Sequence, residues 1–158
     1  MDIKTLELSW NEFEELTERL VKKLPREFDV LLCVSSGGVV LGKLISDYLD
    51  LPLAVIAAQA YKKSETKRTM EEVVVGDIAT THSIEGRILL VDDLVDTGST
   101  MKKIYSSLNE KEKIAKLETA VLYIKPWATF KPNYYVEETE KWVVFPYERR
   151  EFSRKATN

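Results

Sequence analysis

The chain has 158 residues, of which 44% are hydrophobic and 31% are charged, and its formal net charge is −3. This length suits one domain with a buried core, and the composition excludes a disordered chain. The small negative charge gives no general attraction to nucleic acids or acidic membranes, and no apolar run approaches the roughly 18 residues of a membrane helix.

The amino terminus and the cysteine content narrow the class of protein further. The first ten residues lack the apolar centre of a signal peptide. Cys33 is the only cysteine, so the chain has no internal disulfide and no cysteine-rich metal site. The sequence therefore predicts a cytoplasmic protein that binds neither nucleic acid nor membrane.

The predicted elements start with a helix that has a capping box, Ser9 and Glu12, and apolar residues at helical spacing from Trp10 to Leu24. Continuous apolar stretches then predict buried strands, and apolar periodicity predicts further helices. In chain order these are strand 28–34, helix 39–49, strand 51–58, strand 87–91, helix 99–108 and strand 117–124.

Two segments do not fit this pattern of buried elements. Residues 61–72, YKKSETKRTMEE, show no apolar periodicity and predict a long loop of the kind that closes over active sites. Residues 125–158 predict short strands and turns. The order of elements predicts one α/β domain, residues 1–158, with a largely parallel sheet covered by helices on both faces.

The first candidate ligand loop follows the strand that ends at Val34. Ligands of open α/β sheets bind beyond the carboxyl ends of strands, and glycines there let backbone N–H groups face an anion at a helix start. Taken alone, this stretch fits a strand-to-helix turn that needs small residues better than it fits an anion site. It consists of Ser35, Ser36, Gly37 and Gly38.

The same region contains an incomplete nucleotide-binding motif. The residues GGVVLGK fit a G-x-x-x-x-G-K phosphate loop as far as Lys43. The next residue is Leu44, where that motif needs the Ser or Thr hydroxyl that holds magnesium. The sequence therefore excludes a nucleoside triphosphatase of this class.

The second candidate loop lies in ILLVDDLVDTGST, residues 88–100. The turn from Asp96 to Thr100 offers N–H groups, hydroxyls and the positive end of a helix dipole, which suit a phosphate dianion. Asp92 and Asp93 need another partner, either sugar hydroxyls or a magnesium ion. A helix cap plus a solvated acid explains one carboxylate but not three within five positions. The stretch therefore predicts a ribose phosphate site.

This thirteen-residue stretch resembles the phosphoribosyl-diphosphate signature of the type I phosphoribosyltransferases. The resemblance implies a mostly parallel central sheet flanked by helices, with a small C-terminal hood at residues 125–150. It also implies Mg²⁺-dependent transfer of a phosphoribosyl group from phosphoribosyl diphosphate to a base. The acid at Asp96 resembles the 6-oxopurine branch, which acts on hypoxanthine, guanine or xanthine in purine salvage and forms the nucleoside monophosphate.

The resemblance also implies roles for the loop residues. Asp96 would be the general base, and Asp92 and Asp93 would bind the ribose and the metal, directly or through water. Residues 61–72 would form the flexible lid. The 5-phosphate would be held by Asp96, Thr97, Gly98, Ser99 and Thr100, and the diphosphate by Ser35, Ser36, Gly37 and Gly38.

The hood resembles that of bacterial and archaeal xanthine-guanine enzymes. By that resemblance Lys125 would contact the base O6, Trp142 would stack on the purine, and the Val143 backbone would read the base edge. An ammonium donates to a 6-oxo group but is opposed by a 6-amino group, and an indole is a good stacking platform. Without the resemblance, Lys125 fits a surface lysine equally well, and Trp142 fits a core residue.

The sequence departs from the family at Ser36, where a basic residue is common. The loop N–H groups, or Lys62, Lys63, Lys67 and Arg68, would then hold the diphosphate; otherwise the substrate preference has changed or the enzyme is weak. Two rival functions stay open: a regulatory protein that senses phosphoribosyl diphosphate, and a transferase for another base. Homologues of this fold are commonly dimers or tetramers, so we expect a homo-oligomer.

Overall fold

The computed structural model describes residues 4–65, 68–111 and 113–156. In chain order the elements are β1 (Thr5–Glu7), α1 (Trp10–Val21), β2 (Val30–Ser35), α2 (Gly37–Leu49), β3 (Leu53–Glu65), β4 (Arg68–Ala79), β5 (Gly86–Val91), β6 (Leu94–Val95), α3 (Ser99–Asn109), β7 (Ile114–Ile124), β8 (Tyr134–Glu138), β9 (Trp142–Val144) and α4 (Arg149–Ala156).

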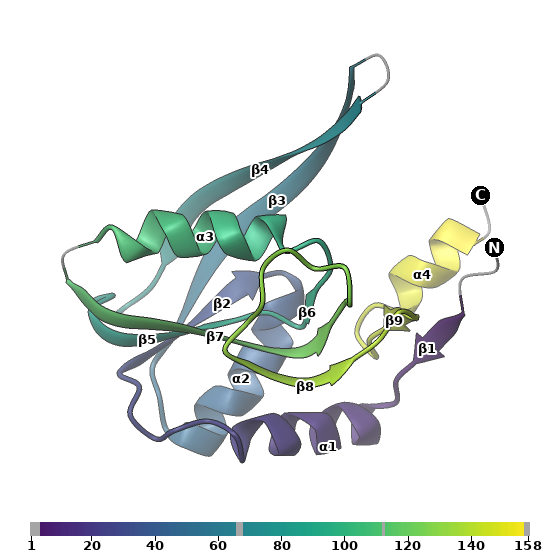
Figure 1. The fold of residues 1–158 in the computed structure, drawn as a ribbon. Coiled ribbons are helices and arrows are strands. Elements are labelled where there is room, and N and C mark those ends of the chain that lie inside the picture. The colour runs from purple at the N-terminus through teal and green to yellow at the C-terminus, as the bar shows by residue number, and fades with distance from the viewer. Residues whose placement is uncertain (1–3, 66–67, 112, 157–158) are drawn as a thin grey trace.

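Seven of these strands form the central sheet, in the order β4-β3-β2-β5-β7-β6, with β8 also paired to β7. Every neighbouring pair in this sheet is parallel except β3 and β4. Figure 1 shows α3 on one face of the sheet and α1 and α2 on the other. The predicted α/β class with a mostly parallel sheet is therefore confirmed.

The strands supply both hydrophobic cores, because successive side chains of a strand point to opposite faces. In β2, Leu31 and Cys33 pack with the apolar residues of α1 and α2, whereas Leu32 and Val34 pack with those of α3. All four of these side chains are buried. A strand buried on both faces reads as a continuous apolar run, which is why the sequence identified it.

Helix α1 has the predicted capping box. The Ser9 hydroxyl accepts from the Glu12 N–H at 3.2 Å, and the Ser9 N–H donates to the Glu12 carboxylate at 2.7 Å. The helix ends at Val21 rather than near Leu24. The Leu24 N–H donates to the Val21 carbonyl at 3.1 Å, three residues back, so the chain tightens into a turn that still buries Leu24.

Within the segment predicted as a loop at 61–72, residues 61–65 belong to β3 and residues 68–72 to β4. Strands β3 and β4 pair antiparallel from Val55 with Ala79 outward to Glu65 with Arg68. Figure 1 shows the two strands projecting well beyond the packed layers. A ribbon that leaves the core needs no apolar face, so its sequence carries no strand periodicity. Residues 66–67 and the side chains of 61–71, including Lys62, Lys63, Lys67 and Arg68, lie outside the described part.

The carboxyl-terminal prediction of strands and turns misses a helix. The predicted short strands are present as β8 and β9. Residues 149–156, however, form the helix α4. Phe152 is the only large apolar residue in this helix, so apolar periodicity had little to detect. Strand β9 pairs in parallel with β1 and ties the hood to the amino terminus. Among the helices in the described ranges, none is long and apolar enough to cross a membrane.

Candidate active site

The two candidate loops meet at one edge of the sheet. Strands β2 and β5 are parallel neighbours, with Cys33 opposite Val91, so their carboxyl ends lie side by side. The first residues of helix α2 lie in close contact with Asp92 and Asp93. A Cβ added at Gly37 would lie 2.3 Å from Asp93 Oδ2, and one added at Gly38 would lie 2.9 Å from Asp92 Cα. The atoms nearest to Gly38 belong to the backbone and cannot move aside, so a side chain there would push the two loops apart.

The two neighbouring acids face different surroundings. Asp92 lines a cavity of about 120 Å³ together with residues of the turn that begins α3. Asp93 turns toward Gly37 instead, and its Oδ2 accepts a hydrogen bond from the Tyr147 hydroxyl at 2.7 Å. The backbone links the pair, because the Asp93 N–H donates to Asp92 Oδ1 at 2.9 Å. Asp92 therefore faces the turn that begins α3, and Asp93 lies between α2 and Tyr147 of the hood.

Both carboxyl groups sit where ionisation is costly. Burial, reinforced by the charge of Asp93, raises the pKa of Asp92 well above its ordinary value. Burial also raises the pKa of Asp93, although the hydroxyl of Tyr147 opposes that rise. A cation beside the two groups would favour their ionised forms and lower both pKa values. Mg²⁺ commonly binds one or two carboxylates and completes its shell with substrate oxygens and water, so these two residues fit that ion.

A magnesium ion held by Asp92 and Asp93 would need its other ligands from the substrate and water. Within the described residues, no three His, Cys, Asp or Glu side chains gather closely enough to hold a metal by themselves. A pair of carboxylates next to a ligand cavity is instead the arrangement typical of a magnesium ion shared with a phosphate substrate.

The predicted 5-phosphate turn has the backbone form of an anion site. Gly98 is the N-cap of α3 with φ of 91°, a left-handed conformation that favours glycine. The first N–H groups of a helix have no partner within the helix and carry its positive dipole end, and Thr100 and Met101 of this first turn line the cavity. The Thr97 hydroxyl lies 2.9 Å from that of Ser99 and accepts from the Ser99 N–H at 3.3 Å. The cavity is lined by Asp92, Leu94, Val95, Asp96, Thr97, Gly98, Thr100 and Met101.

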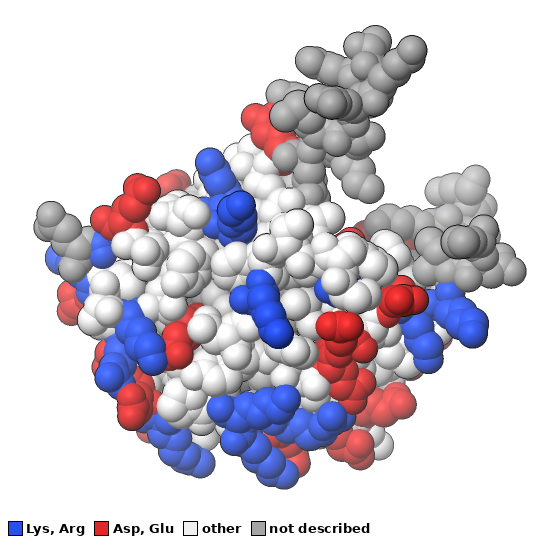
Figure 2. Space-filling model, in the orientation of Figure 1, with Lys and Arg blue, Asp and Glu red and all other residues white. Residues whose placement is uncertain are grey.

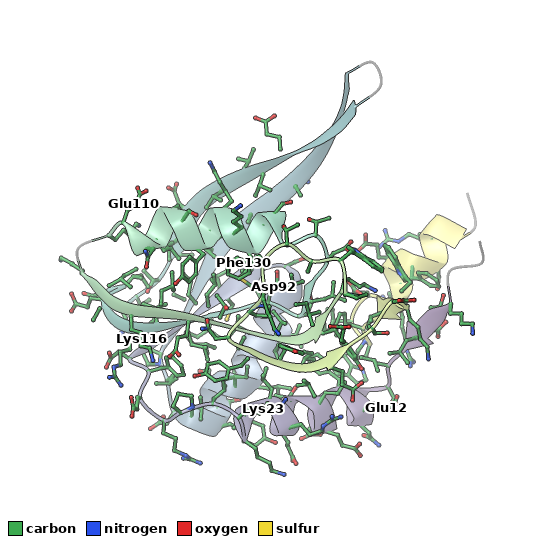
Figure 3. The ribbon with its side chains drawn as sticks, in the orientation of Figure 1. Glu12, Lys23, Asp92, Glu110, Lys116 and Phe130 are labelled. Atoms are coloured by element: carbon green, nitrogen blue, oxygen red, sulfur yellow. The ribbon has the colours of Figure 1, made fainter. Side chains whose placement is uncertain are left out.

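A hood segment, residues 127–130, lies along this turn. The Trp127 indole N–H donates to Asp96 Oδ1 at 2.8 Å, and Thr129 donates to the Thr97 carbonyl through both its N–H, at 2.8 Å, and its hydroxyl, at 3.0 Å. Phe130 closes the far end, since a Cβ on Gly98 would lie 2.7 Å from the Phe130 nitrogen. Figure 3 labels Phe130 of this hood segment and Asp92 of the loop that follows β5.

Lys125 is a buried lysine rather than an ordinary surface one, with 6% of its surface exposed. Its ammonium donates to the Lys141 carbonyl, immediately before β9, and lies 5.5 Å from the centre of the Trp127 ring. Burial lowers the pKa of Lys125, and the nearby carboxylate of Asp96 opposes that fall. The structure therefore brings Lys125 to both the start of β9 and Asp96.

The other predicted base-binding residues lie on β9. Trp142 is 52% exposed, so it is not the core residue that the alternative interpretation required. The Trp142 N–H donates to the Lys4 carbonyl, and the Val144 carbonyl accepts from the Leu8 N–H, so both residues turn their backbone groups toward β1. Because backbone groups alternate along a strand, the N–H and carbonyl of Val143 point to the opposite edge.

The predicted diphosphate loop begins with a cis peptide bond between Ser35 and Ser36. Ser36 is exposed, and Ser35 lines a cavity of about 260 Å³ against β3 and β4. The lining of this cavity is Ser35, Ala57, Ala58, Gln59, Val74 and Gly76. Residues 37–43 lie within α2, which agrees with the exclusion of a phosphate-wrapping loop.

Two residues that contact the candidate site, Trp127 and Tyr147, were not predicted from the sequence. Trp127 holds Asp96, and Tyr147 holds Asp93. Tyr147 stacks on Phe145, with ring centres 5.5 Å apart, and packs edge-on against Phe13 of α1. Both residues stand out in sequence only as hood aromatics, and their partners are 31 and 54 positions away.

Two known proteins are similar in sequence over most of this chain. The chain is 30% identical over 146 residues to the xanthine-guanine phosphoribosyltransferase of Idiomarina loihiensis, covering 89% of this chain and 85% of that protein. It is 32% identical over 114 residues to the hypoxanthine/guanine phosphoribosyltransferase of Methanopyrus kandleri, covering 70% of this chain and 60% of that protein.

A solved structure and a family description point the same way. The crystal structure of the purine phosphoribosyltransferase from Pyrococcus horikoshii superposes with a TM-score of 0.78 at 31% identity, covering 92% of this chain and 94% of that one. The family described as the phosphoribosyl transferase domain matches residues 2–150, which include the sheet, both loops and the hood. The predicted resemblance is confirmed: the chain belongs to the phosphoribosyl transferase domain family.

Proposed function

We propose that this phosphoribosyltransferase transfers the 5-phosphoribosyl group of phosphoribosyl diphosphate to a 6-oxopurine, releasing diphosphate and a nucleoside monophosphate in purine salvage. The observation that carries the proposal is the convergence of Lys125, Asp96 and the α3 turn around one edge of the sheet. The relatives from Idiomarina loihiensis and Methanopyrus kandleri are named for xanthine, guanine and hypoxanthine, all 6-oxopurines.

The base would lie beneath the hood with its six-membered ring against Trp142. The buried ammonium of Lys125 has three donors, one of which serves the Lys141 carbonyl, so others remain to bind O6. A 6-amino group offers donors at the same place and would leave the ammonium unpaired, which favours 6-oxo bases. The backbone of Val143 would read the far edge of the ring.

The chemical step would need a base and a charge-stabilising environment. Asp96 takes the proton from N7 as N9 bonds to the anomeric carbon, while the diphosphate oxygen takes the electrons of the breaking bond. Thr97 to Thr100 hold the 5-phosphate on the N–H groups of α3, and Ser35 to Gly38 hold the leaving diphosphate. Residues 61–72, the predicted lid, would exclude water that would otherwise hydrolyse the sugar.

Asp92 and Asp93 would hold Mg²⁺ together with oxygens of the substrate. When bound, the ion neutralises charge on the leaving diphosphate. Asp92, which lines the same cavity as the α3 turn, would bind the ribose hydroxyls, and Asp93 would face the diphosphate loop.

One observation favours a second function, a regulatory protein that senses phosphoribosyl diphosphate. Ser36 is exposed in the diphosphate loop and offers a neutral hydroxyl where a basic residue would hold the leaving group. Such a regulator would need a surface for nucleic acid. On the described part of the face in Figure 2, basic side chains lie among acidic ones rather than forming a continuous basic surface. The enzyme is therefore the better-supported function.

The test is to incubate the protein with phosphoribosyl diphosphate and Mg²⁺ and to measure diphosphate release with a panel of bases. We expect release with hypoxanthine, guanine or xanthine, and little with adenine, orotate or uracil. Binding of phosphoribosyl diphosphate without release for any base would support the sensing function. Release with a pyrimidine alone would contradict the proposed base class.

Two further expectations accompany this function. We expect a dimer or tetramer in solution, which sedimentation equilibrium measures directly. We also expect the protein to act in the cytoplasm, as its composition indicates.

A further inference from the structure

We propose that Trp127 is a positioning residue that fixes the distance between the two side chains that read the O6 and N7 edge of the purine. The inference rests on the proposed function, because it takes Asp96 as the proton acceptor at N7 and Lys125 as the donor to O6. O6 and N7 lie on adjacent positions of one purine edge, so their two protein partners must be held at a matching separation.

The first contact fixes the carboxylate. The Trp127 indole N–H donates to Asp96 Oδ1 at 2.8 Å. Asp96 is exposed, and its side chain would otherwise rotate in solvent. A hydrogen bond on one oxygen selects one orientation of the carboxylate and leaves the second oxygen for the substrate proton.

The second contact fixes the ammonium. Lys125 Nζ lies 5.5 Å from the centre of the Trp127 ring, within the range of a cation–π interaction. The Lys141 carbonyl accepts from the same ammonium on another side. The lysine is therefore held between the ring and β9, with its remaining donors directed by these two contacts.

The turn that carries Trp127 is itself anchored. The Ala128 N–H donates to the Lys125 carbonyl at 3.0 Å, and Thr129 binds the Thr97 carbonyl. The indole is thus carried on a short turn between Lys125 and the 5-phosphate turn, although 53% of its surface is exposed. An exposed indole held at both its N–H and its ring face is placed to act on its neighbours rather than to fill the core.

Two substitutions separate the two contacts. Trp127→Phe keeps a ring for Lys125 but removes the N–H, so it should lower kcat about tenfold, as expected for the loss of a hydrogen bond to a charged group. Its KM for hypoxanthine and guanine should stay within about twofold of the wild-type value. Trp127→Ala removes the ring as well and should also raise the KM for these bases about two- to fivefold, the size of an exposed cation–π contact.

Three controls keep the role distinguishable from a structural one. Trp10→Phe makes the same exchange at an exposed tryptophan of α1 and should leave kcat and KM unchanged. The affinity of each Trp127 variant for ribose 5-phosphate, measured by calorimetry, should match the wild type. The unfolding midpoint of Trp127→Phe should also match.

Several results would overturn the inference. A wild-type kcat in Trp127→Phe overturns it, as does an equal loss of ribose 5-phosphate affinity, which would mean that Trp127 only supports the turn. The same loss in Trp10→Phe would show a general effect of the exchange. A wild-type protein that transfers to none of the three 6-oxopurines would overturn the proposed function itself, whereas an active wild type with an unaffected Trp127→Phe overturns only this role.

Discussion

Lys125 and Asp96 form an unlike pair of charges, one buried and one exposed, at the edge of the hood. Burial lowers the pKa of Lys125 because water no longer solvates its charge, while Asp96 favours the charged form. An ammonium with few water neighbours binds a carbonyl oxygen more strongly than a hydrated one does. The selectivity proposed for 6-oxo bases therefore depends on burial as much as on charge.

Replacing Asp96 by asparagine tests the proposed general base. Asp96→Asn keeps the shape of the side chain and an oxygen for the Trp127 N–H, but it removes the proton acceptor. Turnover should fall by about 10² or more, measured as diphosphate release with hypoxanthine. Asp47→Asn, an exposed carboxylate of α2, is the matched control. A near-normal rate for Asp96→Asn would remove Asp96 from this role.

Removing the buried ammonium tests base recognition. Lys125→Ala should raise the KM for 6-oxopurines by about tenfold or more, because O6 loses a charged donor. The affinity for phosphoribosyl diphosphate, measured by calorimetry, should change far less. Lys43→Ala removes an exposed lysine of α2 and serves as control. Equal losses for base and diphosphate sugar would refute recognition by Lys125.

At the scale of elements, the start of α3 and the hood segment at 127–130 act as one unit. Three consecutive residues of the turn each meet this segment: Asp96 binds Trp127, Thr97 binds Thr129, and Gly98 lies against Phe130. The 5-phosphate turn is thereby held from its outer side, while α3 packs through its apolar residues against the sheet. A turn fixed in advance does not have to be ordered when the ligand binds, which favours affinity.

Gly98→Ala tests this unit. The left-handed φ and the Phe130 backbone both oppose a side chain, so the free energy of unfolding should fall by about 1–3 kcal/mol in urea titrations. Affinity for ribose 5-phosphate should fall as well. Gly86→Ala is a matched control, since Gly86 has a φ of 79° and a Cβ there would lie 2.3 Å from Asp29 Oδ2.

The Gly86→Ala control separates the effect of backbone strain on stability from the effect of the α3 turn on ligand affinity. Gly86→Ala should lose stability to a similar extent while keeping its affinity for ribose 5-phosphate, because Gly86 begins β5, at the opposite end of that strand from the acids. Unchanged affinity in Gly98→Ala would show that the turn does not hold the phosphate.

At the scale of the molecule, the site unites distant parts of the chain and places two half-buried carboxyl groups side by side. Strands β2 and β5 bring two loops together, and Tyr147 reaches Asp93 from the carboxyl-terminal part. The raised pKa values of Asp92 and Asp93 mean that the folded state binds their protons more tightly than the unfolded chain does. Their contribution therefore favours folding at low pH and opposes it once both groups ionise.

Asp92→Asn tests this linkage. The contribution of Asp92 to stability is full below the unfolded carboxyl pKa of about 3.9 and is lost as the pH rises through the higher folded value. The variant should thus have a higher Tm than the wild type at neutral pH, and the difference should vanish near pH 4. Calorimetric scans across this range measure it. A variant less stable than the wild type at neutral pH would contradict the buried-charge account.

The sequence predicted the elements that carry a continuous apolar run or a capped helical pattern, but it did not predict β1, β6 or residues 73–79 of β4. The apolar runs of β2, β5 and β7 identified them, and the capping box at Ser9 identified the start of α1. Residues 61–65 of β3, residues 68–72 of β4 and helix α4 were not predicted correctly, because none of them has the apolar pattern of a core element. The roles of Asp92, Asp93 and Asp96 stay predictions, although their positions fit those roles.

The sequence by itself determined the ligand class expected at the turn and the family, because residues 88–100 are contiguous and hold their chemistry within one strand, turn and helix start. Only the tertiary structure decided that Trp127 binds Asp96, that Tyr147 binds Asp93, and that the ammonium of Lys125 reaches β9. These contacts join residues 16 to 54 positions apart. Their geometry depends on how the hood closes over the sheet, which no local pattern encodes.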